Sequence, residues 1–247
     1  MNKERIDNLL VERGLAESIG MAHALVMSGV VLSDELRVDK PSQTLPIESI
    51  IRIKGAQTGS KYVGRGGKKL EAALASFHIR PDEYVCLDIG ASTGGFTDCL
   101  LQQGAKHVTT IDVGTNQLVW GLRNDPRVQV RENTNARHLS ANDFDLLFDL
   151  AVMDVSFISA TKILPAIFPL LKDDGNLIVL IKPQFEVEKG EIGKGGIVRE
   201  PEHHQRVVAS VNMFAASIGF NVLNVIDSPI LGAEGNKEFL ALYGRRK

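Results

Sequence analysis

The chain has 247 residues, a formal net charge of −2, 44% hydrophobic residues and 23% charged residues. This composition is typical of a soluble globular protein, and no apolar run approaches the roughly 18 residues that a membrane-spanning helix needs. The N-terminal stretch carries a charge every few residues, unlike a signal peptide, so we expect a cytoplasmic protein. The length fits one domain of about 180 residues and one small module.

The first 55 residues are predicted to form a small module. The expected elements are helices over 5–14 and 18–29, a hairpin over 30–40 that turns at 33–35, and a strand over 49–54. Ser18 is a good N-cap for the second helix, and a glycine follows each helix. The polar stretch 56–62 predicts a linker. We therefore expect one domain over 1–58 and another over 62–247.

Strands and helices alternate through the rest of the chain. We expect strands over 84–90, 107–114, 128–133, 146–154, 176–186, 221–229 and 237–246, and helices over 65–77, 95–104, 118–125, 160–175 and 203–219. Near-continuous apolar strands separated by helices predict an α/β fold with a Rossmann-like, doubly wound, seven-stranded sheet. The last two strands have no helix between them, so we expect the final one to be antiparallel.

Charge and cysteines add two expectations. Six basic residues and no acid lie between Arg52 and Lys69, which fits a solvated face or, if the N-terminal module binds RNA, a contact with a polyanion. Cys86 and Cys99 lack the spacing of metal ligands, so we expect reduced, buried thiols and no metal site.

The stretch "VCLDIGASTGGFTDCLLQQG", residues 85–104, reads as a strand, a glycine-rich turn and a helix. A nicotinamide dinucleotide fingerprint needs G-x-G-x-x-G, and Ser92 stands at its second glycine. A nucleotide-binding P-loop needs Gly-Lys-Ser/Thr, which this turn lacks. The run "GEIGKGG" fails too, because Gly195 follows its lysine.

An adenosine-bearing ligand without a pyrophosphate, chiefly S-adenosylmethionine, fits the turn best; a dinucleotide or a purely structural turn remains open. Asp88 is placed to orient the turn and the ammonium end of the ligand, and Asp112 to accept hydrogen bonds from ribose hydroxyls. The predicted cofactor-binding residues are Asp88, Gly90, Ser92, Gly94, Gly95, Phe96, Asp112 and Asp154.

Four charged residues are expected around the same edge of the sheet. Asp154 and Lys182 end two strands next to the glycine turn, Glu238 begins the final strand, and Lys69 lies on the preceding helix. An ammonium at the mouth of an apolar strand is costly unless a carboxylate pairs with it. These residues could be rim charges or structural ion pairs. Alternatively, a lysine held by carboxylates could position a hydroxyl and take its proton during methyl transfer.

At these residues the sequence resembles a known family. The segments "YVGRGGKKL", "LDIGASTGGFTDCLL", "VMDVSFIS", "IKPQFE", "GKGGIVR" and "GNKEFL" are similar to those of the hemolysin A (TlyA) group of FtsJ-like ribosomal RNA 2′-O-methyltransferases. The resemblance covers nearly the whole chain. It implies a class I methyltransferase sheet, S-adenosylmethionine as donor and a cytidine ribose of ribosomal RNA as acceptor. It also implies a catalytic Lys-Asp-Lys-Glu tetrad at Lys69, Asp154, Lys182 and Glu238, without a metal.

The N-terminal module resembles the small α+β RNA-binding domain named after ribosomal protein S-four. That domain usually has Ser-Arg at the start of its second helix and Asn-Gly in its hairpin, where this chain has Ser18-Ile19 and an acidic turn. The residues that we expect to contact RNA are Arg5, Arg13, Arg52, Lys54, Arg65, Lys68, Lys189, Lys194 and Arg199. The last three belong to a glycine-rich stretch, 188–200, which is either a plain surface loop or a lid over the active site.

Other readings remain open. The chain could be an inactive protein that binds RNA or the ribosome, or it could act on membranes, as the hemolysin name implies. Activity on membranes needs a membrane-inserting amphipathic segment, which the sequence does not show. Phe157 and Phe185 follow two proposed catalytic residues and could stack on the target base. We expect Trp120 to be buried in the core, and no function for His203 or His204.

Overall fold

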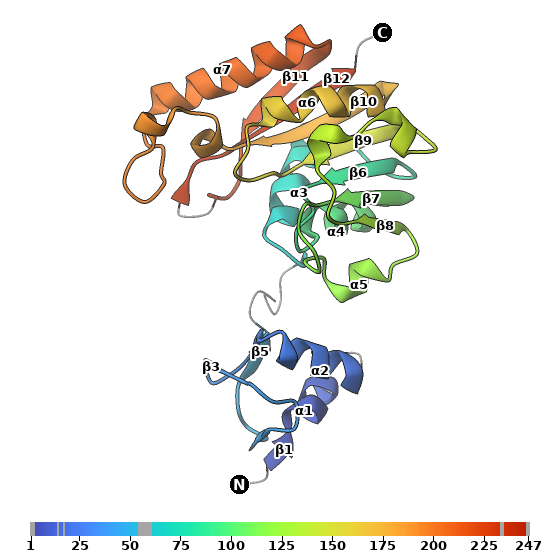
Figure 1. Cartoon of the computed structure of the whole chain (residues 1–247), viewed down its shortest axis with the longest axis vertical. Coiled ribbons are helices and arrows are strands. Elements are labelled where there is room, and N and C mark those ends of the chain that lie inside the picture. Colours follow the sequence, from blue (N-terminus) through green and yellow to red (C-terminus); the bar gives the residue numbers. More distant parts are fainter. Residues whose placement is uncertain (1–2, 14, 17, 54–60, 233–234, 246–247) are drawn as a thin grey trace. The chain divides into compact units, whose positions relative to one another are not determined.

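The computed structural model describes residues 3–13, 15–16, 18–53, 61–232 and 235–245. The chain divides into two compact units, residues 1–64 and 65–247 (Figure 1). Lys54, one of the predicted RNA contacts, lies outside the described residues, as does most of the predicted linker. The side chain of Lys189 lies outside them too.

The first unit packs two short helices against two small sheets. Its elements are β1 (Lys3–Arg5), α1 (Ile6–Glu12), α2 (Ile19–Met27), β2 (Val31–Ser33), β3 (Leu36–Arg37), β4 (Thr44–Pro46) and β5 (Ile51–Ile53). One sheet has the order β3-β2-β5, and β1 pairs with β4 in the other, a pairing that the sequence did not predict. Ile6 and Leu10 of α1 are fully buried in one cluster with Val26 of α2 and Val31 of β2.

Two local predictions in this unit are confirmed. The backbone N–H of Met21 donates to Ser18 Oγ over 3.2 Å, so Ser18 caps α2. Ser33 pairs with Leu36 across the hairpin between β2 and β3. The two residues between them have positive φ, 48° and 68°, the conformation that suits the right-handed twist of a two-residue hairpin.

The second unit is built on one seven-stranded sheet. Its main elements are α3 (Gly66–Ser76), β6 (Val85–Ile89), α4 (Gly95–Gln102), β7 (His107–Ile111), α5 (Trp120–Arg123), β8 (Val128–Arg131), β9 (Phe148–Met153), α6 (Leu164–Ile167), β10 (Leu171–Ile181), α7 (Pro201–Ser217), β11 (Phe220–Asp227) and β12 (Phe239–Arg245). The strand order is β11-β12-β10-β9-β6-β7-β8. β12 is antiparallel to both its neighbours, as predicted, while the five strands from β10 to β8 are parallel.

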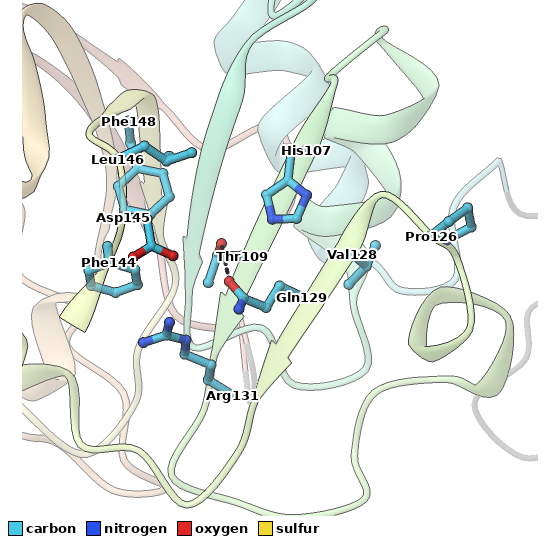
Figure 2. A pocket seen from close by; sticks show the side chains of 10 residues that line it. All are labelled: His107, Thr109, Pro126, Val128, Gln129, Arg131, Phe144, Asp145, Leu146 and Phe148. Atoms are coloured by element: carbon cyan, nitrogen blue, oxygen red, sulfur yellow. Dashed lines mark hydrogen bonds between the residues drawn. The ribbon is translucent and has the colours of Figure 1, made fainter.

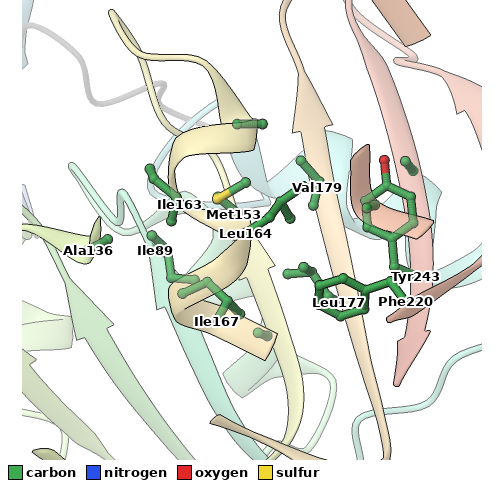
Figure 3. Close-up of a cluster of buried hydrophobic side chains, with 14 of the residues drawn as sticks. Ile89, Ala136, Met153, Ile163, Leu164, Ile167, Leu177, Val179, Phe220 and Tyr243 are labelled. Atoms are coloured by element: carbon green, nitrogen blue, oxygen red, sulfur yellow. The ribbon is translucent and has the colours of Figure 1, made fainter. Parts of the chain in front are cut away.

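Helices cover both faces of this sheet. On one face, α6 and α7 enclose a large buried cluster that includes Leu164, Leu177 and Val179 (Figure 3). Leu87 and Ile89 of β6 belong to this cluster, so the intervening Asp88 points to the other face, because side chains alternate along a strand. The Thr97 hydroxyl of α4 donates to Asp88, which places α4 on that second face. The Rossmann-like fold is therefore confirmed.

The predicted helix over 160–175 is wrong. The chain there forms a 3₁₀ turn, the four-residue α6 and a second 3₁₀ turn, and β10 already begins at Leu171. Pro165 and Pro169 explain the short pieces, because a proline cannot donate an intrahelical hydrogen bond and fits only the first turn of a helix. The helix expected over 118–125 is also shorter, and its Trp120 is 57% exposed, so the prediction of a core tryptophan is wrong.

Candidate functional site

The glycine-rich turn between β6 and α4 is tied to the end of β7 by one carboxylate. The N–H of Ser92 donates to Asp112 Oδ2 over 2.8 Å, and the N–H of Gly114 donates to Asp112 Oδ1 over 2.7 Å. Each carboxylate oxygen has a second lone pair. Asp112 therefore fixes the turn and can still accept hydrogen bonds from a ligand.

Asp88 lies beneath the same turn and is fully buried. Its Oδ2 accepts a hydrogen bond of 2.6 Å from Thr97 Oγ1, and its Oδ1 has no hydrogen-bond partner among the described residues. Burial, with a smaller contribution from the charge of Asp154, raises the pKa of Asp88 to about 7. A buried carboxyl with an open acceptor suits a cationic ligand next to the turn.

The glycines of the turn are explained by close packing of the chain on itself. Gly90 has φ 82°, and a Cβ there would lie 2.3 Å from the backbone oxygen of Asp154. Gly94 has φ 99°, and its Cβ would lie 2.3 Å from Leu122 Cδ1. Phe96 is buried, and its ring packs on Gly66 of α3. These three residues shape the turn, so a direct contact with a ligand is not needed to account for them.

Lys182 and Asp154 form an ion pair where β10 and β9 end. Lys182 Nζ lies 2.6 Å from Asp154 Oδ1 and donates a second hydrogen bond, of 2.9 Å, to Ser156 Oγ. Both side chains of the ion pair keep some exposure to solvent. The lysine is therefore held on two sides and remains accessible to a substrate.

A second lysine–carboxylate pair is more deeply buried. Lys69 Nζ of α3 lies 2.5 Å from Glu238 Oε2, and Glu238 is only 2% exposed. The neighbouring Lys68 is exposed on the same helix. Gly232 lies so close to Glu238 that a Cβ would be 2.0 Å from Glu238 Oε1. The chain therefore encloses this carboxylate on the side away from the lysine.

The sheet register brings the two pairs to one edge. Ile181 of β10 is opposite Phe239 of β12 in an antiparallel ladder, so the next position places Lys182 opposite Glu238. Ile89 is opposite Met153 in the parallel pair of β6 and β9, which places the glycine turn beside Asp154. All four predicted catalytic residues therefore lie around the edge where β6, β9 and β10 end and β12 begins.

Two phenylalanines stand at the same edge. Phe157 is 91% exposed and has φ 64°, a rare conformation for a bulky residue. Its ring centroid lies 5.2 Å from that of Phe185, and Lys182 Nζ lies 5.9 Å from the Phe185 centroid. An exposed, strained aromatic residue beside an ion pair is typical of a functional surface.

Three predicted RNA contacts of the first unit that the structure describes are engaged within that unit. Arg5 makes two hydrogen bonds, of 3.0 and 2.6 Å, to the buried Asp7 and holds the pKa of that carboxyl well below its usual range. Arg13 donates to the backbone oxygens of Ile47 and Ser49. Arg52 pairs with Glu35 of the hairpin turn. Arg13 thus stabilises the module, while Arg5 and Arg52 remain about half exposed.

Four predicted RNA contacts of the second unit point to solvent. Arg65 and Lys68 are exposed at the start of α3, and Lys68 directly precedes the buried Lys69. Lys194 and Arg199 are exposed in the glycine-rich stretch that follows β10. Arg65 and Lys68 therefore offer positive charge on the helix that carries Lys69.

A cavity of about 410 Å³ is lined by residues of β7, β8 and the segment 144–148 (Figure 2). Its floor includes Thr109 of β7 and Gln129 of β8, which share a hydrogen bond of 3.2 Å, and Phe144 and Phe148 form one wall. None of the predicted catalytic or cofactor-binding residues lines it. This cavity is therefore distinct from the candidate site.

Sequence reasoning missed two polar residues of the site. Thr97 lies nine positions after Asp88, in the first turn of α4, and Ser156 follows Asp154 by two positions. In the sequence, each of these two residues is a hydroxyl residue within two positions of a predicted site residue, and that proximity could have identified them.

Among the described residues, no group of three or more His, Cys, Asp or Glu side chains could hold a metal ion. In the same part of the chain, every helix is too short or too polar to cross a bilayer.

Two family models match the chain: an FtsJ-like methyltransferase over residues 62–245 and an S4 domain over residues 4–51. A relative from Mycobacterium tuberculosis, named 16S/23S rRNA (cytidine-2′-O)-methyltransferase TlyA, is 43% identical over 96% of this chain and 88% of its own. Hemolysin A of Brachyspira hyodysenteriae is 43% identical over 97% and 99%. A solved structure from Streptococcus thermophilus, described as a candidate hemolysin, has a TM-score of 0.75 and 46% identity, and the match covers 100% of this chain and 90% of that one.

Proposed function

We propose, from the premise that this chain belongs to the FtsJ-like methyltransferase family, that it methylates the ribose 2′-hydroxyl of a cytidine in ribosomal RNA with S-adenosylmethionine as donor. The observation that carries the proposal is the Lys182–Asp154 ion pair beside the glycine turn, at the edge where parallel strands end. The relative from Mycobacterium tuberculosis carries this activity in its name, and its likeness extends over nearly the full length of both chains.

The residues around the turn fit the donor. Asp88 offers a buried, open carboxyl oxygen to a cationic group, and Asp112 can accept hydrogen bonds from ribose hydroxyls at the end of β7. Val113 follows Asp112 and is 71% exposed, which offers an apolar surface to a base. The bound donor supplies an electrophilic methyl carbon on a sulfonium.

Lys182 is the residue that we assign to the acceptor hydroxyl. Asp154 and Ser156 hold its ammonium group, so Nζ can keep the 2′-oxygen in place for in-line attack. During methyl transfer the carbon–sulfur bond of the donor would break as the oxygen–carbon bond forms, and the hydroxyl proton would leave to water, or to Lys182 once its ammonium group has released a proton to solvent. The Lys69–Glu238 pair lies next along the same edge, where it supports the acceptor side of the site.

RNA binding is divided between the two units in this proposal. Residues 1–58 form the RNA-binding module and residues 62–247 the methyltransferase domain. Arg65, Lys68, Lys194 and Arg199 are the exposed cations of the second domain that would contact phosphates. The exposed ring of Phe157 is placed to stack on a base turned out of its helix. A substrate in a ribosomal subunit would place the enzyme in the cytoplasm.

The direct test is transfer of labelled methyl groups from S-adenosylmethionine to purified ribosomal subunits and to naked ribosomal RNA, followed by mapping of the modified nucleotide. Lys182→Ala should lower the rate about a hundredfold or more, the usual contribution of a positioned acid–base group, and should leave donor binding unchanged. Lys172→Ala is the matched control, because Lys172 pairs with Asp149 at the other end of β10.

Two outcomes would contradict the proposal. A Lys182→Ala variant with wild-type rate would remove Lys182 from the chemistry. A wild-type protein that binds the donor and methylates no ribosomal RNA would favour an inactive RNA-binding protein. Leakage of liposomes on addition of purified protein would support the membrane activity that the name of the Brachyspira relative implies.

A further inference from the structure

The stretch between β10 and α7 leaves the site at Lys182 and returns past the start of β12. Its middle forms a tight turn in which Gly193 N–H donates to Ile197 O over 3.0 Å, with Gly195 and Gly196 at positive φ. The first half is attached to α7 through Glu191, which pairs with Arg206. The returning half is attached through Gly196 and Val198.

Val198 is held from both sides by buried side chains. Asn236 Oδ1 accepts from Val198 N–H over 3.0 Å, and Asn236 Nδ2 donates to Gly196 O over 3.0 Å. His204 Nε2 lies 2.9 Å from Val198 O, and because a carbonyl only accepts, Nε2 must carry the proton. Val198 and Asn236 are each 2% exposed, and His204 is 8% exposed.

The same contacts reach the proposed catalytic edge. The His204 ring packs on Phe239, with centroids 5.8 Å apart, and Phe239 directly follows Glu238. Asn236 precedes Glu238 by two positions, and its backbone oxygen accepts from Gly232, the residue packed on Glu238. The returning loop, the start of α7 and the turn around Glu238 therefore form one connected set of contacts.

We propose that His204 is a positioning residue that clamps the loop of residues 193–198 to the strand start carrying Glu238. The hydrogen bond from His204 fixes the loop, and its ring fixes Phe239, so one side chain joins the loop that bears Lys194 to the Lys69–Glu238 pair. His204 itself touches neither RNA nor donor in this assignment. The role in methyl transfer rests on the proposed function; the clamp itself does not.

Two substitutions of His204 separate its hydrogen bond to Val198 from its packing on Phe239. His204→Phe keeps a ring against Phe239 and removes the donor, whereas His204→Gln keeps a donor for Val198 O. Tyr243→Phe is the matched control, because it removes one hydrogen bond, of 2.7 Å from Tyr243 to Asn212, between α7 and β12 and keeps its ring. His204→Leu replaces His204→Phe if the latter does not fold.

The first readout is native-state trypsin cleavage after Lys194, identified by mass, because slow digestion reports how often the loop opens. The second is kcat for methyl transfer to RNA, with the dissociation constant of the donor. We expect His204→Phe to speed cleavage and lower kcat by about fivefold each, the effect of losing one ordinary hydrogen bond, with donor binding unchanged. His204→Gln, which keeps the donor, should stay within about twofold of wild type in cleavage rate, and Tyr243→Phe should do so in both readouts.

Wild-type cleavage rates in His204→Phe would overturn the clamp. Faster cleavage with unchanged kcat would overturn its role in positioning. A wild-type protein without methyl transfer would overturn the proposed function alone, because the cleavage rates would still decide whether the clamp exists.

Discussion

Lys69 and Glu238 are 169 residues apart in the sequence and share a hydrogen bond of 2.5 Å between Lys69 Nζ and Glu238 Oε2. Both side chains are almost completely removed from solvent. Two charges buried in this way depend on each other, because loss of either partner leaves the other unpaired in a medium that solvates it poorly. The pair therefore ties α3 to the start of β12 in stability as well as in position.

Removing one partner of this pair should destabilise the fold. Lys69→Met leaves the Glu238 carboxylate without its cation, and we expect the free energy of unfolding to fall by about 3 kcal/mol. The double variant Lys69→Met/Glu238→Gln should recover part of that loss, because no buried charge remains. Urea denaturation of the single and double variants measures both effects. Lys172→Met, at an ion pair nearer the surface, should cost less than about 1 kcal/mol, and an equal cost at both sites would contradict the argument.

Stability should depend on pH through Asp88. Its pKa is raised from 3.8 to about 7 by burial, so the folded state favours the protonated form. The Asp88 carboxyl loses its proton at about pH 4 in the unfolded chain but only at about pH 7 in the folded protein. The stabilisation is therefore fully present below about pH 4, and the free energy of unfolding should fall as the pH rises from about 4 to about 7. The shift corresponds to at most about 4 kcal/mol.

The Asp88→Asn variant tests this dependence, because it cannot ionise. Its midpoint of urea unfolding, compared with that of the wild type at pH 5 and pH 8, should change less with pH and should exceed the wild-type midpoint at pH 8. Parallel pH profiles of the two proteins would show that Asp88 is not the group responsible.

RNA affinity should respond differently to two basic residues. Lys68 is exposed on α3, so Lys68→Ala should reduce the slope of log affinity against log salt concentration by about 0.7 to 0.9 without changing stability. Arg13→Ala should instead lower the unfolding midpoint of the N-terminal unit, because Arg13 binds two backbone oxygens there. RNA titrations at several salt concentrations, together with thermal melts, compare the two. A salt slope unaffected by Lys68→Ala would remove Lys68 from the RNA surface.

Replacing Phe157 with asparagine should increase the stability of the protein and weaken its activity on RNA. Its positive φ costs about 1 kcal/mol or more, which Phe157→Asn relieves because asparagine tolerates this conformation. We therefore expect Phe157→Asn to be more stable and to have a higher KM for RNA. Phe157→Leu keeps the strain and loses the aromatic ring, so it should match the KM effect without the gain in stability. Unchanged KM in both variants would exclude stacking on the substrate.

The sequence predicted the sheet and the position of its edge because these follow from periodicity. Apolar strands alternating with helices required parallel neighbours, and the carboxyl ends of such strands meet at one edge, which grouped Asp154 with Lys182. The prediction of a helix over 160–175 was wrong because it relied on the helical spacing of apolar residues and gave too little weight to Pro165 and Pro169. The prediction that Trp120 is buried was wrong because residue type alone does not decide which side of a short helix faces solvent.

Contacts between distant residues could not be read from the sequence. Arg13 was expected to contact RNA, yet it binds carbonyl oxygens 34 and 36 positions away. The partners of Lys69 and Lys182 were predicted as a group from the family resemblance, whereas their division into two pairs is visible only in the structure. The assigned roles of these four residues remain predictions until the variants are measured.

The reversed direction of β12 has a practical consequence. Because this strand begins at the edge that holds Glu238 and runs away from it, Arg245 pairs with Phe220 at the far side of the sheet. A fluorescent label attached to a residue at the end of β12 would therefore lie opposite the edge that holds Glu238. Such a label should allow single-molecule studies on ribosomal particles with that edge unobstructed.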